Sequence, residues 1–482
     1  MQADPDGLNQ AFIPLQTFEQ EAAAFNERCP AYVRTAAIDD LRQREYARLD
    51  RLGHIYLDFT GGGLYSERHV QAHFDLLREN VFGNPHSSNP TSLAMTRWVE
   101  SARAAVLAFF NAPAEEYVCI FTQNASGALK LVGEAYPFGK DCHYLLTFDN
   151  HNSVNGIREY AHAKGADVTY VPLTLPDMRV DEKIREEYLE KGKNSCAHLF
   201  AYPAQSNFSS VQHPLEWIDK AHAMGWDVLL DAAAYAPTNR LDLTAWPADF
   251  VSISFYKIFV YPTGVGALIA RRSVLKKLQR PWFAGGTITV ASVQGEKHYL
   301  ADAPAAFEDG TLDFLNIPAV TIGLENLEAM GLDLVHERVR CLTGWLLMNL
   351  KEMKHTNGKP LIKIYGPADT KKRGGAISTN FFTPEGAVID HRWIEQQASL
   401  HGISLRTGCF CNPGAGELAL HILPEELTSC FPRPDHEQRL TYDEFRLCIN
   451  AKASGAVRIS VGPLSNFADV EKFLDFVTTF LQ

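Results

Sequence analysis

Two short segments of this chain each end in an ionisable side chain, and the pair could do chemistry together. Asp231 follows an apolar run at 227–230, and Lys257 follows a second run at 250–254. Both runs are typical of buried parallel strands, and open α/β sheets bind ligands at the carboxyl ends of such strands. An amine and a carboxylate placed there suit pyridoxal phosphate, since the amine forms its Schiff base and the carboxylate faces its pyridine nitrogen. A surface lysine and a helix-capping aspartate would explain these two segments equally well.

Two further features could serve such a cofactor. Ala125 and Ser126 follow an apolar run and open a helical pattern. Unpaired N–H groups and a hydroxyl at a helix N-terminus favour an anion such as phosphate. His151, after the run 143–147, could stack on a ring or move protons. A simple helix cap and a structural histidine are the alternatives.

The loop 405–414 carries Cys409 and Cys411 among glycine and proline residues. A metal site would need further ligands at short spacing, and the sequence supplies neither a second cysteine pair nor a nearby histidine pair. A nucleophilic thiol is the better functional interpretation, with a chemically idle pair of loop cysteines as the alternative. Arg458, in an apolar run at 456–461, could clamp a carboxylate through its bidentate fork or form a structural ion pair.

A mainly parallel sheet is needed to position these side chains. Up to about residue 315, short apolar runs alternate with helical patterns, which predicts an α/β fold with helical crossovers. The expected strands are 54–58, 117–121, 143–147, 167–171, 197–201, 227–230, 250–254 and 266–270. After residue 320 the pattern predicts a smaller α+β unit with helices at 332–353, 391–401 and from 466, and strands at 361–365, 376–382, 403–406 and 456–461.

We therefore predict three parts. Residues 1–54 form a helical segment that packs with the small domain, 55–318 form the large cofactor-binding domain, and 319–482 form the small C-terminal domain with the cysteine loop and Arg458. The N-terminal segment should break near Cys29, before a proline, and the charged stretch 431–445 should be a surface excursion.

The composition limits the class of protein. The chain has 482 residues, 46% of them hydrophobic and 21% charged, as in ordinary globular proteins. Its formal net charge of −12 argues against a nucleic-acid or anionic-membrane surface. The nine cysteines are scattered, the first residues lack the pattern of a secretory signal, and no run of eighteen apolar residues occurs. We expect reduced cysteines and a cytoplasmic enzyme that does not enter a membrane.

Longer motifs, taken in order, resemble the cysteine desulfurase group of class V, fold-type I pyridoxal-phosphate enzymes. Within that group they look most like the desulfurase-like domain of molybdenum cofactor sulfurases, over roughly residues 55 to 478. The motifs are Gly83-Asn84-Pro85-His86-Ser87, the segments 200–209 and 253–259, Tyr261-Pro262-Thr263-Gly264, Phe307-Glu308-Asp309-Gly310-Thr311, and the loop 406–414. The resemblance implies a large domain with a mainly parallel sheet and a smaller α+β domain.

The same resemblance implies roles for individual residues around pyridoxal 5'-phosphate. Lys257 resembles the Schiff-base lysine, Asp231 the partner of the pyridine nitrogen, and His151 the histidine that stacks on the ring and shuttles protons. The other cofactor-binding positions it implies are Ala125, Ser126, Ser254 and Tyr256 at the phosphate, Gln205 at the ring oxygen, and Gly310 with Thr311, which would reach a phosphate in the neighbouring subunit of a homodimer.

The implied substrate is L-cysteine or a cysteine-derived amino acid. Arg458 matches the clamp for its carboxylate, and Asn207 is expected in the same substrate site. Cys411 matches the persulfide carrier, with Cys409 the less favoured position, so L-cysteine would leave as L-alanine. A C–S lyase or an aminotransferase of the same class would need Lys257 but no persulfide cysteine. A non-catalytic relative would be expected to lack the lysine.

The sulfur acceptor stays open. The resemblance does not include the carboxyl-terminal domain that receives the molybdenum cofactor in full-length sulfurases, since the chain ends at residue 482.

Overall fold

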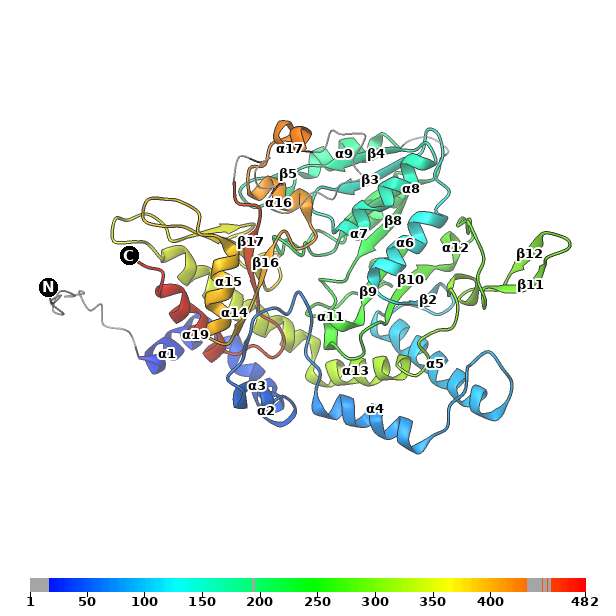
Figure 1. Ribbon diagram of the computed structural model, residues 1–482, viewed down its shortest axis with the longest axis horizontal. Coiled ribbons are helices and arrows are strands. Elements are labelled where there is room, and N and C mark those ends of the chain that lie inside the picture. The colour runs from blue at the N-terminus through cyan, green and yellow to red at the C-terminus, as the bar shows by residue number, and fades with distance from the viewer. Residues whose placement is uncertain (1–16, 193–195, 431–443, 445–448, 450–451) are drawn as a thin grey trace.

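The computed structural model describes residues 17–192, 196–430, 444, 449 and 452–482 (Figure 1). Apart from residue 444, the charged stretch expected at the surface in 431–445 lies outside the described residues. The described part contains a seven-stranded sheet with helices on both faces and a separate four-stranded sheet near the carboxyl end. The predicted α/β class is therefore confirmed.

The seven-stranded sheet has the strand order β2-β10-β9-β8-β7-β3-β4. β10 runs antiparallel to both of its neighbours, and the other pairs are parallel. Its strands are β2 (Tyr117–Thr122), β3 (His143–Thr147), β4 (Asp167–Val171), β7 (His198–Pro203), β8 (Trp226–Asp231), β9 (Phe250–Ser254) and β10 (Gly266–Arg271).

Alternate residues of each strand enter different cores, because strand side chains point to opposite faces. Val118 and Ile120 pack in one core, which α6 and α8 cover, while Cys119 and Phe121 pack in the other, which α5 and α13 cover. The helices of this part are α4 (Glu67–Glu79), α5 (Pro90–Phe109), α6 (Ala125–Ala135), α7 (Asn152–Asn155), α8 (Ile157–Ala163), α9 (Glu182–Glu190), α10 (Trp217–Ala223), α11 (Phe255–Phe259), α12 (Arg272–Leu275), η2 (Ala305–Phe307) and α13 (Ile317–Met330).

Two short hairpins accompany this sheet. They are β5 (Leu173–Thr174) with β6 (Arg179–Val180), and β11 (Ile288–Ser292) with β12 (Lys297–Leu300). The second hairpin projects from the edge of the molecule in Figure 1 and was not among the expected strands. Its side chains are exposed on both faces, so the sequence shows no burial pattern there.

The carboxyl-terminal part is built on the antiparallel sheet β13-β14-β17-β16. Its strands are β13 (Ile362–Tyr365), β14 (Ala376–Phe381), β16 (Arg406–Gly408) and β17 (Ala456–Ser460). Its helices are α14 (Leu332–Glu352), α15 (His391–Leu400), α16 (Pro413–Ala419), α17 (Pro424–Cys430) and α19 (Phe467–Thr478). The early strand β1 (Ile55–Tyr56) pairs with β15 (Ile403–Ser404) of this part, and Leu57 joins its core.

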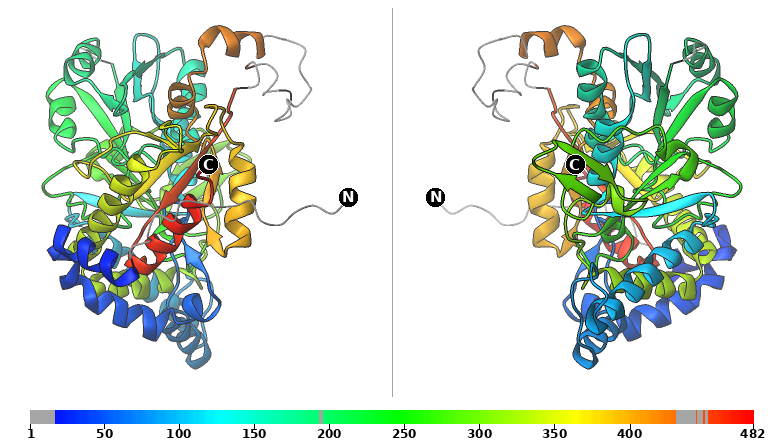
Figure 2. Two further views of the ribbon diagram at one scale, coloured as in Figure 1. Left: turned by 90° about the vertical axis from the view of Figure 1, so that its left-hand side faces the viewer. Right: turned by 90° about the vertical axis from the view of Figure 1, so that its right-hand side faces the viewer.

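The amino-terminal segment packs against α14 and α19, as Figure 2 shows for the blue, yellow-green and red ribbons. It consists of α1 (Phe18–Arg28), η1 (Pro30–Thr35), α2 (Ala36–Glu45) and α3 (Arg48–Arg51), with the expected break after Cys29. The buried Arg42 pairs with Asp469, and the buried Arg338 pairs with Asp39. These contacts join the described part of the amino-terminal segment to α14 and α19, and the division of the chain into three domains stays a prediction.

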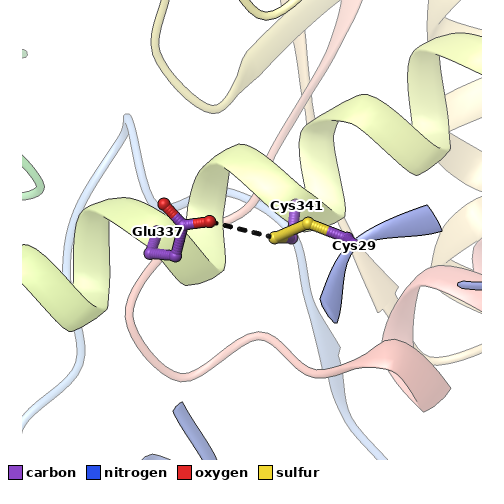
Figure 3. Close-up of side chains that lie close together, drawn as sticks. All are labelled: Cys29, Glu337 and Cys341. Carbon is purple, nitrogen blue, oxygen red and sulfur yellow. Dashed lines mark hydrogen bonds between the residues drawn. A yellow bond between two sulfur atoms is a disulfide. The ribbon is translucent and has the colours of Figure 1, made fainter. Parts of the chain in front are cut away.

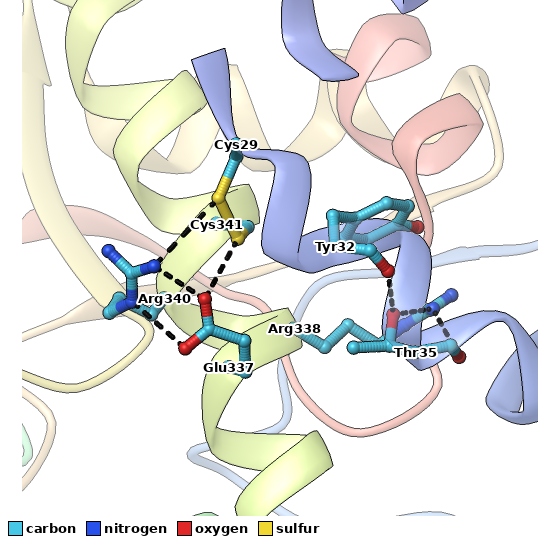
Figure 4. The surroundings of a disulfide bond; sticks show 7 residues. All are labelled: Cys29, Tyr32, Thr35, Glu337, Arg338, Arg340 and Cys341. Atoms are coloured by element: carbon cyan, nitrogen blue, oxygen red, sulfur yellow. Dashed lines mark hydrogen bonds and ion pairs between the residues drawn. A yellow bond between two sulfur atoms is a disulfide. The ribbon is translucent and has the colours of Figure 1, made fainter. Parts of the chain in front are cut away.

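A disulfide joins Cys29 to Cys341 on α14, across 312 residues of sequence (Figure 3). The expectation of reduced cysteines is therefore wrong for this pair. Cys29 meets Cys341 only because α1 and η1 pack on α14. The spacing of the cysteines in the sequence does not predict this long-range contact. Glu337 and Arg340 lie beside the bond, while Arg338, on another face of α14, bonds Thr35 (Figure 4).

Candidate active site

The predicted lysine and aspartate lie at the carboxyl ends of adjacent parallel strands. Asp231 is the last residue of β8, and Lys257 lies in α11, directly after β9. Asp231 is 8% exposed, and its Oδ1 accepts hydrogen bonds from Ser252 Oγ and the Ala233 N–H, both at 3.1 Å. Both of these bonds go to one oxygen, which orients the carboxylate and leaves Oδ2 for a further partner.

Lys257 has a lowered pKa. Burial lowers it most, the charge of Asp231 raises it, and the charge of Arg458 lowers it further. The depressed pKa increases the fraction of neutral amine, which is the form that acts as a base or nucleophile. Since Asp231 and Arg458 both act on this pKa, the structure brings these three predicted residues within electrostatic reach of one another.

His151 joins the same group from the N-cap position of α7. Its Nδ1 accepts the N–H of Ser153 at 3.1 Å, so the proton of the neutral imidazole lies on Nε2. Burial lowers the pKa of His151, Asp231 raises it, and Lys257 lowers it. The histidine is therefore neutral near pH 7 and lies close to both charged groups.

The predicted phosphate-binding residues Ala125 and Ser126 lie at the start of α6. Ser254 Oγ, at the end of β9, accepts the N–H of Ala125 at 2.8 Å, which ties the helix start to the lysine-bearing segment. Asn124 caps the helix by accepting the Gly127 N–H at 3.0 Å. The hydroxyl of Ser126 is exposed and lies 2.5 Å from that of Ser153. Two hydroxyls at the amino end of an eleven-residue helix form a donor set suited to phosphate.

Two other predicted cofactor positions are Gln205 and Tyr256. Gln205 is buried; its Nε2 donates to the Ala234 carbonyl at 3.0 Å, and its Oε1 accepts from Gln212 at 3.0 Å. Gln205 and Lys257 line the same small cavity. Tyr256 is half-buried, and burial raises the pKa of its hydroxyl.

The predicted pair Gly310 and Thr311 lies on the loop after η2. Thr311 lines a cavity of about 290 Å³ together with Gln123 and Gly127, at the start of α6. Gly310 has a φ of 75°, which favours glycine at this turn. Contact of this pair with a neighbouring subunit stays a prediction.

The cysteine loop is held against the large sheet by amide groups. The Asn152 N–H donates to the Cys411 carbonyl, and Asn207 Nδ2 donates to the Phe410 carbonyl, both at 2.7 Å. Asn412 Nδ2 donates to the Asp149 carbonyl at 2.7 Å and to Asn207 Oδ1 at 2.9 Å. The side chain of Asn207 thus contacts the loop, and its predicted contact with substrate stays a prediction. Asn412 was not among the predicted site residues, although it lies inside the selected loop and helps to hold it in place.

The two cysteines of this loop have different surroundings, although both are exposed. A negative charge on Cys411 would raise the pKa of Lys257 and of Arg458, and the neighbouring Phe410 ring lies 4.6 Å from the Arg458 guanidinium, so Cys411 lies within electrostatic reach of both groups. Partial burial raises the pKa of Cys409, whose other charged neighbour is Glu417. This difference favours Cys411 as the thiol that meets a substrate bound near Lys257.

Arg458 lies on β17 with 2% of its surface exposed. It donates to the Asn207 carbonyl at 2.9 Å and to Asp58 Oδ1 at 3.1 Å, so the ion pair considered as its alternative role is present. Asp58 also pairs with Arg406 at 2.6 Å. The sequence reasoning missed Asp58, although a carboxylate at the end of a strand, just before the glycine turn 61–63, was a usable signal.

The chain matches the family model described as aminotransferase class-V over residues 55–473. The chain belongs to this family. It is 36% identical to the molybdenum cofactor sulfurase of Arabidopsis thaliana over 478 residues, covering 91% of this chain and 58% of that protein. The human molybdenum cofactor sulfurase is also 36% identical, with 92% and 51% covered. The chain thus spans little more than half the length of these relatives.

Solved structures show the same fold. An apo cysteine desulfurase from Thermococcus onnurineus superimposes with a TM-score of 0.75 at 24% identity, covering 92% of this chain and 98% of that one. A mutant of the lyase C-DES, with glycine covalently linked to its PLP cofactor, gives 0.68 at 16% identity, covering 91% and 99%. Membership of the class V family implies a pyridoxal phosphate cofactor. The residues present fit it, because Lys257, the oriented carboxylate of Asp231 and the donors at the start of α6 are the groups that its aldehyde, ring nitrogen and phosphate require.

Proposed function

We propose that this chain is a pyridoxal-phosphate-dependent cysteine desulfurase that resembles the catalytic part of molybdenum cofactor sulfurases. Lys257 would hold the cofactor, Asp231 would face its ring nitrogen and His151 its ring, and the start of α6 with Ser254 would hold its phosphate. When bound, pyridoxal phosphate supplies an electron sink for the bonds at the substrate α-carbon. The observation that carries the proposal is the placement of Cys411 on a loop that is tethered to Asn152, contacts Arg458 through Phe410 and lies within electrostatic reach of Lys257.

The chain's own residues divide the remaining work. Arg458, buried and oriented by Asp58 and the Asn207 carbonyl, binds the α-carboxylate of L-cysteine. Lys257 Nζ, whose lowered pKa favours the neutral amine, takes the α-proton. His151 presents the proton on Nε2 to the reacting groups, because its Nδ1 is engaged by Ser153.

Cys411 Sγ then takes the sulfur atom. The Cβ–S bond of the substrate breaks, an S–S bond forms on Cys411, and the former β-carbon receives a proton. The balance is L-cysteine plus the Cys411 thiol giving L-alanine plus a Cys411 persulfide. The proton of the Cys411 thiol leaves as the S–S bond forms, and it balances the proton that the β-carbon receives.

We also infer a homodimer. The hairpin β11–β12 exposes apolar side chains, including Val293 at 96% and Tyr299 at 70%. Exposed apolar surface of this kind supports a protein interface, and the predicted reach of Gly310 and Thr311 into a neighbouring subunit agrees with one.

Two observations bear on the cellular location of the protein. In the part of the chain that is described, no helix is both long and apolar enough to cross a membrane. The cytoplasmic location stays a prediction, and the Cys29–Cys341 disulfide argues against it. The acceptor stays open.

A C–S lyase is the second candidate function, because the lyase C-DES in complex with its product cysteine persulfide superimposes on this chain with a TM-score of 0.66. The two functions differ in the need for Cys411. In Cys411→Ala the visible absorbance of the bound cofactor should persist, while alanine formation from L-cysteine should fall at least about 100-fold and mass spectrometry should find no added sulfur on the loop. Cys409→Ala is the matched control and should retain most activity. Undiminished product release by Cys411→Ala would overturn the desulfurase proposal in favour of the lyase.

A further inference from the structure

Two arginines face each other directly in the small sheet. Arg406 on β16 is the cross-strand partner of Arg458 on β17. Like charges directly opposite each other in an antiparallel pair destabilise it unless an anion lies between them. Asp58, which follows β1 and comes from almost 350 residues earlier in the chain, supplies that anion and is 7% exposed.

The aspartate does not divide its contacts equally. Arg406 donates to Asp58 Oδ2 through Nη2 at 2.6 Å and through Nε at 2.9 Å. Arg458 gives Asp58 a single bond at 3.1 Å, and its buried Nε has no hydrogen-bond partner among the described residues. Arg406 is therefore occupied by the aspartate, whereas Arg458 keeps donor capacity on its buried side.

Space as well as charge favours this arrangement. A Cβ added to Gly61 would lie 2.6 Å from one Asp58 oxygen and 2.7 Å from Arg406 Nη2, and closer still to the other oxygen. The glycine turn after the strand thus leaves room for the aspartate–arginine pair, which a side chain at this position would displace.

Asp58, Arg406 and Arg458 form a cluster with a net charge of +1, since two guanidinium groups share one carboxylate. Both arginines lower the pKa of Lys257, so the excess charge acts where the substrate's α-carbon must lie. One added carboxylate would neutralise the cluster. A second one would find Arg406 already taken by Asp58.

We propose that Asp58 is a specificity-determining residue that holds Arg406 away from the substrate and leaves Arg458 with room for one carboxylate. The site then accepts amino acids with a single carboxylate and disfavours those with a second one on the side chain. This inference rests on the proposed function, because it takes Arg458 to be the substrate's carboxylate clamp.

The test measures binding to the holoenzyme rather than turnover. The absorbance of the bound cofactor is titrated with L-alanine and with L-aspartate, and the ratio of the two dissociation constants gives the selectivity. In Asp58→Asn the freed Arg406 should shift this ratio toward L-aspartate by at least about 10-fold, as expected for a new charge-assisted fork. The double variant Asp58→Asn with Arg406→Gln should lose that gain. Asp39→Asn, which breaks the pair with Arg338 in the amino-terminal segment, is the control and should leave the ratio unchanged.

A second variant covers the case in which Asp58→Asn does not fold. The Arg406 side chain is 51% exposed, so Arg406→Gln should fold, and Asp58 would then pair with Arg458 alone. The dissociation constant for L-alanine should rise at least about 10-fold.

The outcomes separate this inference from the function it rests on. A selectivity within twofold of wild type in Asp58→Asn, or an unchanged L-alanine constant in Arg406→Gln, would overturn the role of Asp58 alone. A wild-type protein that responds to neither amino acid would overturn both proposals. Normal binding without a persulfide on Cys411 would overturn the desulfurase function and leave the role of Asp58 standing.

Discussion

Replacing Asp231 by asparagine tests whether this carboxylate faces the ring nitrogen of the cofactor. The buried Oδ1 accepts two hydrogen bonds, from Ser252 and Ala233, and these donors should hold the oxygen of an asparagine amide in the same place. The amide NH2 would then stand where Oδ2 stands. Since that group donates and carries no charge, it cannot keep a pyridine nitrogen protonated.

The loss is at least that of a hydrogen bond between charged groups, about 1.5–3 kcal/mol. At 1.36 kcal/mol per factor of ten, kcat for alanine formation should fall roughly 10- to 150-fold. Stopped-flow absorbance at saturating L-cysteine, with alanine quantified by chromatography, measures this. Ser252→Ala removes only one orienting donor and serves as the control, with a smaller loss. A kcat for Asp231→Asn within threefold of wild type would mean that another residue faces the nitrogen.

Two further predictions concern stability. His69 is buried, its Nε2 lies 2.6 Å from the Ala319 carbonyl, and burial lowers its pKa from 6.5 to about 4. As the pH falls, the unfolded chain binds this proton before the folded chain does, so the free energy of unfolding should decrease by about 3 kcal/mol between pH 6.5 and pH 4. Chemical denaturation across this pH range should show a smaller decrease for His69→Gln than for wild type. An equal decrease in both proteins would contradict this. Cys29→Ser removes a disulfide that joins residues 312 positions apart, and it should lower the free energy of unfolding by about 3–5 kcal/mol. Cys409→Ser changes an exposed free cysteine and should leave that free energy unchanged. Equal free energies of unfolding for the two variants, measured by chemical denaturation, would refute a stabilising disulfide.

The strands of the large sheet were predictable because each one is a short apolar run that can be recognised from its own few residues. The runs 143–147, 167–171 and 250–254 match β3, β4 and β9 at both ends. β3 and β9 are buried on both faces and have a nearly continuous apolar sequence. β4 is an edge strand and is mostly half-buried. The positions of Asp231 and Lys257 followed from the same reasoning, because a residue at the end of such a strand must lie at the edge of the sheet. Their chemical roles needed the longer motifs.

The contacts that complete the site were not predictable, because they join segments far apart in the chain. Asp58 meets Arg406 across 348 residues and Arg458 across 400. Each residue has an ordinary local explanation, and no spacing rule links them. The pairing of β1 with β15 brings Asp58 to the small sheet, and the expected domain boundary at residue 55 gave no indication of that pairing.

The backbone of the cysteine loop gives the strongest structural argument that this segment is functional. Phe410 and Cys411 have φ angles of 56° and 55°, a left-handed conformation that costs about 1–2 kcal/mol for a side-chain-bearing residue. Two consecutive residues keep it because hydrogen bonds from Asn207 and Asn152 hold their carbonyl groups. A loop whose only need was to connect β16 to α16 would relax to an unstrained path or use glycine. The chain instead maintains strain where it fixes the direction of one thiol, and such strain persists when position matters more than local stability.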